Sequence, residues 1–333
     1  MTLTLRPMSL SEILDRTFEI FRSNLAAFIV LSALPALAMM SLEVANQFWW
    51  RLFPDSFGPR VFLWFTPQIL LYQLVLTQIG ILLNILFWPA FALVVSKFVS
   101  AERTGAASAL AACRLRWSSW LGLGLANWLA ALLFPEFVMA ILLAGTAYLL
   151  FEVMGLDPDP SQFGPRVFLA FLVIGWCLFQ WLSAGFSLSV PVWMLEKTKI
   201  RAALGRGWRI SKSSRFRLFF ARMMPLIVGR ILTFAGTTSV LFLMYAALKH
   251  TAYWPYAYRR ALDGASIFIS FVVATVVGPI FPIALTLIYY DQRIRLEGYD
   301  IERLIEASGM NTPVPALTLD IVVTTTEPEE TGL

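Results

Sequence analysis

Two uncharged apolar runs constrain the fold of this chain more than any other feature. The run "LAAFIVLSALPALAMMSL" covers residues 25–42, and "ASIFISFVVATVVGPIFPIALTLIYY" covers residues 265–290. Runs of about 18 or more apolar residues are typical of membrane spans, because about 20 helical residues cross the hydrocarbon core. A backbone inside lipid must satisfy its own hydrogen bonds, so each isolated span is expected to be an α-helix. These runs therefore predict an all-α integral membrane protein.

The low charge content extends this prediction to most of the chain. Only 14% of the 333 residues are charged, whereas soluble domains have about 25%. Six transmembrane helices are predicted, at 25–45, 67–95, 120–150, 167–194, 217–247 and 265–290. The third is longer than a bilayer requires, so we expect it to tilt, to kink at Pro135 or to project beyond the membrane.

The basic residues predict the orientation. Of the 26 lysines and arginines, 19 lie in residues 1–24, 96–118, 196–222 and 291 onward, which share one side of the predicted topology. Basic loops stay in the cytoplasm. Both termini are therefore predicted to be cytoplasmic, in the inner (plasma) membrane of a bacterial cell, and the first span is expected to be retained rather than cleaved as a signal peptide.

A repeated heptapeptide indicates internal duplication. "FGPRVFL" occurs at 57–63 and again at 163–169, each time before an even-numbered span on the predicted outer side. Serines enter the odd-numbered spans, at Ser23, Ser118 and Ser213. We interpret the chain as three pseudo-repeats, each an amphipathic helix followed by a helical hairpin. Within the heptapeptide, proline favours a helix start, and Arg60 and Arg166 are predicted to reach lipid head groups.

The repeats define the predicted domain organisation. A six-span membrane domain covers residues 1–307. Its repeats are about 1–95, 96–194 and 195–290, and a cytoplasmic helix follows at about 291–307. A flexible tail, 308–333, completes the chain. Prolines near the returning ends of the spans (Pro89, Pro191, Pro279 and Pro282) predict kinks.

Two segments read as amphipathic helices. In 9–22, Leu10, Ile13, Leu14, Thr17, Phe18 and Phe21 share one face, and Ser9 followed by Glu12 predicts a capping box. In 199–212, Ile200, Leu204 and Trp208 share one face, away from the basic residues Lys199, Arg206, Arg209 and Lys212. Such a helix can lie in the membrane interface, and it can also pack against the cytoplasmic ends of the spans. The two interpretations are compatible. The four basic residues are candidate contacts for anionic lipid head groups.

The two ends of the chain resemble a known family. "LRPMSLSEILDRTFEIFRSNLAAFIVLSALP" (5–35) and "LIYYDQRIRLEGYDIERL" (287–304) resemble the opening and the close of the bacterial glycerophosphoryl diester phosphodiesterase membrane domain. In some relatives this domain anchors a phosphodiesterase barrel. Only about 25 residues follow here, whereas a barrel needs about 250. The resemblance thus implies a stand-alone membrane domain without phosphodiesterase activity.

Ionisable residues inside spans are candidate functional residues. Glu43, Glu136 and Arg230 lie at similar distances from the serines that enter their spans. Glu136 and Arg230 are predicted to form an intramembrane ion pair, because a partner offsets the cost of desolvation. The pair either fixes helix register or belongs to a gate or a head-group site.

No catalytic constellation, cofactor motif or metal-ligand cluster is visible in the sequence, and no nucleic-acid partner is predicted. We expect a non-enzymatic protein without cofactors, and its role to be membrane organisation, partner anchoring or lipid handling. Its expected partners are membrane lipids, anionic ones above all, and a further membrane protein. The alternative is a transporter or flippase-like permease with a polar site between the repeats.

Overall fold

The computed structural model describes residues 6–52, 67–129 apart from 103, 180–248 apart from 182, 254–299 and 301. All regular structure in these residues is helical. Four of the described helical stretches are long and apolar enough to cross a membrane: Leu25–Phe48, Gln78–Val99, Arg215–Ala247 and Ala261–Glu297. They match the first, second, fifth and sixth predicted spans, which confirms the all-helical prediction. Most of the third span and half of the fourth lie outside the described residues, so the number six remains a prediction.

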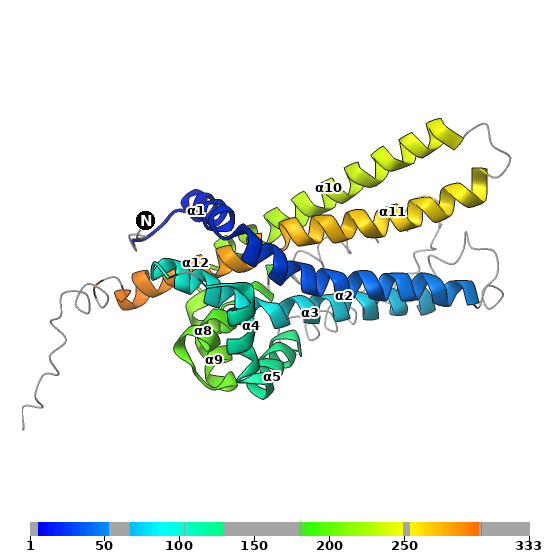
Figure 1. Ribbon diagram of the computed structural model, residues 1–333. Coiled ribbons are helices and arrows are strands. Elements are labelled where there is room, and N and C mark those ends of the chain that lie inside the picture. Colours follow the sequence, from blue (N-terminus) through cyan, green and yellow to red (C-terminus); the bar gives the residue numbers. More distant parts are fainter. Residues whose placement is uncertain are drawn as a thin grey trace, which may run out of the picture.

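The long helices form two hairpins that diverge from a shared base (Figure 1). The first hairpin consists of α2 (Leu25–Leu52) and α3 (Pro67–Val99), and the second of α10 (Arg215–Leu248) and α11 (Trp254–Val277). At the base lies what we call the packed end, which contains α1 (Leu10–Ser23), α4 (Ala106–Arg114), α5 (Trp117–Trp128), α8 (Ser189–Glu196), α9 (Ile200–Ser211) and α12 (Ile280–Glu297). Most of the buried apolar side chains gather there.

Short helices precede three of the longer apolar segments. The chain breaks at Asn24 between α1 and α2, at 115–116 between α4 and α5, and at 212–214 between α9 and α10. This order is the one predicted for each repeat. The duplication itself remains a prediction, because both copies of the heptapeptide lie outside the described residues.

The N-terminus of α1 forms half of the predicted capping box. The Ser9 hydroxyl accepts a hydrogen bond from the Glu12 backbone N–H at 3.3 Å. The Glu12 carboxylate pairs with Arg6 at 2.6 Å, so it does not return to the Ser9 N–H. Ile13 and Thr17, both on the predicted apolar face, are buried.

Helix α9 is packed into the molecule through its small residues. Ala203, Gly207 and Ile210 are buried, and the backbone of α8 passes beside Gly207. The predicted face of Ile200, Leu204 and Trp208 is only half-buried. The packed alternative for this helix is therefore confirmed, with the contact face shifted toward the small residues, because only they allow two backbones to approach this closely.

The sixth predicted span consists of two helices. Helix α11 ends at Val277, and Pro279 occupies the N-cap position of α12. A Cβ atom at Gly278 would lie 2.4 Å from the Ala274 carbonyl oxygen, so this turn requires glycine. A break in the helix thus lies at the predicted position of Pro279, and the kink itself stays a prediction. Helix α12 then continues without a break to Glu297.

Two glycines of α9 offer a matched test of this packing. A Cβ at Gly207 would lie 2.5 Å from the Ser189 backbone nitrogen, whereas a Cβ at Gly205 would meet nothing within 4 Å. We expect Gly207→Ala to lower the free energy of unfolding by about 1–3 kcal/mol, which is typical of overpacking. Gly205→Ala should be neutral or stabilising by up to about 1 kcal/mol. Unfolding in detergent measures both, and equal effects would contradict the close approach.

Candidate functional site

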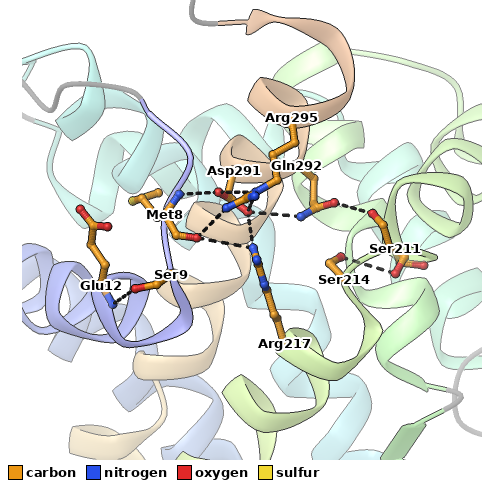
Figure 2. A network of polar contacts seen from close by, with 10 residues as sticks. Met8, Ser9, Glu12, Ser211, Ser214, Arg217, Asp291, Gln292 and Arg295 are labelled. Carbon is orange, nitrogen blue, oxygen red and sulfur yellow. Dashed lines mark hydrogen bonds and ion pairs between the residues drawn. The ribbon is translucent and has the colours of Figure 1, made fainter.

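A fully buried carboxylate lies at the centre of the packed end. The Asp291 side chain on α12 is 0% exposed (Figure 2). Its Oδ1 accepts the backbone N–H of Met8 at 2.7 Å, and its Oδ2 accepts Nη1 of Arg217 at 2.7 Å. Nε of Arg295 lies 3.0 Å from Oδ1 and 2.9 Å from Oδ2. One carboxylate therefore joins the N-terminal segment, α10 and α12.

The same two arginines also hold the other side of Met8. Its carbonyl oxygen accepts Nη2 of Arg295 at 2.9 Å and Nη1 of Arg217 at 3.5 Å. Gln292 extends the network: its Nε2 donates to Asp291 at 3.2 Å, and its Oε1 accepts the Ser213 hydroxyl at 2.7 Å. The backbone just before α1 is thus clamped between α10 and α12 (Figure 2).

The chemistry of this network is structural. Burying a carboxylate costs several kcal/mol, and only close cations and hydrogen bonds offset that cost. Asp291 receives one backbone N–H, one amide N–H and two guanidinium groups. With both oxygens engaged in this way, the carboxylate is arranged to fix three segments rather than to transfer a proton.

A second network lies where α9 meets α8 and α12. Nε of Arg206 is 2.7 Å from a Glu196 carboxylate oxygen, and its Nη2 is 2.7 Å from Glu297. Glu297 also pairs with Arg293 at 3.1 Å. The Tyr289 hydroxyl donates to Glu196 at 2.9 Å. This network ties the predicted amphipathic helix to the body of the protein.

The structure places the predicted head-group contacts in different surroundings. Lys199, Arg209 and Lys212 are exposed on or beside α9. Arg206, in contrast, is held by two carboxylates, so its principal contacts lie inside the molecule. Arg60 and Arg166 lie outside the described residues.

The predicted intramembrane ion pair remains a prediction. Arg230 lies on an exposed face of α10, and Glu136 lies outside the described residues. Glu43, at a similar predicted depth, is half-buried in α2.

The sequence analysis missed a different arginine of α10. Arg222 counted there only as one of the basic residues of 196–222. Its Nη1 donates to the Ser183 hydroxyl at 2.5 Å, and its guanidinium lies 5.8 Å from the centre of the Phe281 ring. The available signal was the polar pair Gln180 and Ser183, three residues apart inside a predicted span.

We next consider metal-ligand clusters and the Cys113 thiol in the part of the chain that the structure describes. No group of three or more His, Cys, Asp or Glu side chains there could hold a metal ion. Cys113 is buried in α4, and burial raises the pKa of its thiol to about 11. The thiol is therefore protonated at neutral pH, whereas the thiolate is the reactive form.

Comparison with known proteins gives no relative for this chain. No protein-family model, curated protein or solved structure matches it. The resemblance of its two ends to the phosphodiesterase membrane domain therefore stays a prediction.

The Asp291 network makes a quantitative prediction. Asp291→Asn should lower the free energy of unfolding by about 1.5–3 kcal/mol, because the charge-assisted hydrogen bonds of the buried carboxylate are lost while its partners Arg217 and Arg295 remain partly exposed to solvent. It should also increase hydrogen exchange of the backbone near Met8. The matched control is Glu102→Gln, which breaks an ion pair with Lys97 whose side chains are 58% and 41% exposed. That loss should stay below about 1 kcal/mol. Equal losses in the two variants would exclude a clamp at Asp291.

Proposed function

We propose that this chain is a six-span bacterial inner-membrane protein, built as three repeats with both termini in the cytoplasm, and that it binds anionic lipids at its packed end rather than catalysing a reaction. Four membrane-length helices support the membrane assignment. The positive-inside rule supports the orientation, since 19 of the 26 basic residues lie in segments that share one predicted side.

Helix α9 carries the observation on which the lipid assignment rests. One face is buried against its neighbours through Ala203, Gly207 and Ile210. The exposed surface of the helix and its ends presents basic side chains, namely Lys199, Arg201, Arg209 and Lys212. A basic residue close to an anionic membrane surface contributes about 1 kcal/mol of attraction. A helix docked by one face thus presents its charges for head groups.

Large apolar side chains are exposed in the adjoining turns. Leu115, between α4 and α5, is 86% exposed, Trp117 at the start of α5 is 62% exposed, and Phe216 at the start of α10 is 68% exposed. Exposed aromatic and aliphatic groups beside basic residues are typical of the boundary between head groups and acyl chains. Their place at the beginnings of α5 and of the membrane-length helix α10 supports a packed end that lies at the cytoplasmic membrane surface.

This arrangement favours lipid handling within the wider expectation of membrane organisation. Because the spans already hold the protein in the membrane, the exposed bases are not needed for attachment. Their role would be to gather anionic lipids around the protein, or to present a charged surface to a membrane-protein partner.

Replacement of the exposed bases tests the proposal. Lys199, Arg201, Arg209 and Lys212 are changed to Gln together, and Arg206 is kept because its removal would leave Glu196 and Glu297 without their partner. We expect fewer phosphatidylglycerol and cardiolipin molecules retained in native mass spectrometry. A cysteine introduced at Ser56, labelled only from outside the cell, verifies the orientation of the variant.

Two results would contradict the proposal. Unchanged lipid retention in a correctly oriented variant would leave these bases with a role in topology alone. Passage of a fluorescent-headgroup lipid across liposomes containing the purified protein, measured by dithionite quenching, would instead support the permease alternative.

A further inference from the structure

Arg222 lies in a position where an arginine requires a partner. It is partly buried on α10, seven residues beyond Arg215, which corresponds to about 10 Å along the helix. Helix α10 is one of the helices long and apolar enough to cross a membrane. An ionisable group in such a helix is costly unless it is paired or faces a polar site.

Three carboxylates of the packed end are engaged with other arginines. Asp291 pairs with Arg217 and Arg295, while Glu196 and Glu297 pair with Arg206. Within the part of the chain that the structure describes, Arg222 enters no ion pair. The negative charge that would balance it must therefore come from outside these residues.

Among the described residues, Arg222 uses only part of its hydrogen-bonding capacity. A guanidinium has five N–H donors, and the contact with Ser183 uses one of them. The Phe281 ring lies within cation–π range and occupies no donor. The Ser183 hydroxyl itself donates to the Gln180 backbone carbonyl at 3.0 Å, so it accepts from Arg222 in a fixed orientation. The arginine is thus positioned, with donors to spare.

Neighbouring groups add to this polar site. The Gln180 side chain is 5% exposed, and its Oε1 has no hydrogen-bond partner in the described structure. Arg215 lies on the same face of α10, two helical turns away, with its guanidinium 4.2 Å from the Trp208 ring centre. Its Nε is also buried and without a hydrogen-bond partner in the described part. Two cations therefore lie on one face of α10, and the unsatisfied amide of Gln180 lies three residues before the serine that holds Arg222.

We propose that Arg222, supported by Arg215, Ser183 and Gln180, binds the phosphate group of an anionic amphiphile, with a membrane phospholipid or a free phosphate as its source. A guanidinium fork matches two phosphate oxygens, and charge-assisted bonds of this kind are the strong ones. The assignment to a phospholipid rests on the proposed function. With the exposed bases of α9 at the membrane surface, Arg222 lies close to the depth at which head groups meet acyl chains, because the head-group layer is about 5–8 Å thick on each side.

The test compares ligands that differ in their phosphate. Thermal unfolding of the full chain in detergent is followed against dioctanoyl phosphatidylglycerol, dioctanoylglycerol, which has no phosphate, and inorganic phosphate. We expect phosphatidylglycerol to stabilise the protein and dioctanoylglycerol not to do so. Protection by inorganic phosphate at equal concentration would identify a free anion as a ligand of the same site.

Variants then assign the effect to Arg222. Arg222→Gln should weaken the apparent affinity about tenfold or more, since a tenfold change corresponds to 1.4 kcal/mol. Arg222→Lys keeps the charge but loses the planar fork, and should give an intermediate affinity. Arg114→Gln, which removes an exposed base at the end of α4 that is not among the proposed lipid contacts, should leave the affinity unchanged within twofold. Where Arg222→Gln does not fold, Arg222→Lys decides, and wild-type affinity in that variant would overturn the site.

The outcomes separate this site from the proposed function. Wild-type affinity in Arg222→Gln, alongside lipid loss in the α9 variant, would overturn the site and leave lipid binding intact. Equal stabilisation by dioctanoylglycerol would also overturn it, because acyl chains alone would then explain the effect. A third outcome is that Arg222→Gln loses affinity while the α9 variant retains its lipids. This outcome would support the site at Arg222 and would overturn the proposed lipid binding by the exposed bases of α9.

Discussion

The buried carboxylate of Asp291 is the interaction on which the packed end depends. A charge removed from water in this way is destabilising by several kcal/mol unless its surroundings compensate it. Here the compensation comes from Arg217 on α10, Arg295 on α12 and the backbone N–H of Met8. The carboxylate can be buried only when all three segments are in place. It therefore couples the segment before α1 to helix α12, 283 residues later in the sequence.

Helix α12 carries this coupling to the other helices. It is buried along most of its length, and a break at Gly278 separates it from α11. Tyr289 reaches Glu196 at the end of α8, and the Tyr290 hydroxyl reaches Ser96 near the end of α3 at 3.0 Å. The ends of α8 and α3 are thereby joined through α12, while the hairpins diverge away from it (Figure 1).

The sequence predicted the elements better than it predicted their contacts. The apolar runs predicted the described membrane-length helices, because an uncharged run of about twenty residues is typical of a membrane span. Ser9 predicted the start of α1, because its side chain accepts a hydrogen bond from the first turn. The contact face of α9 was harder to predict. Large residues such as Trp208 dominate a hydrophobic pattern, whereas the close approach of two helices selects Gly207. The Asp291 network could not be predicted for another reason. Its partners are distant in the sequence, and each charged residue taken alone is indistinguishable from one on an exposed surface.

The arginines of the packed end divide into two groups, and the division argues for a ligand. Arg217, Arg295 and Arg206 are matched by carboxylates and explain the architecture. Arg222 has no carboxylate partner among the described residues. The positive-inside rule does not explain the presence of an arginine at this partly buried position, because exposed bases such as Arg209 satisfy that rule equally well. An apolar side chain at this position would avoid the cost of desolvation. Under our proposal, an anion bound by the guanidinium that Ser183 holds would offset this cost, and it could also account for the unsatisfied amide of Gln180.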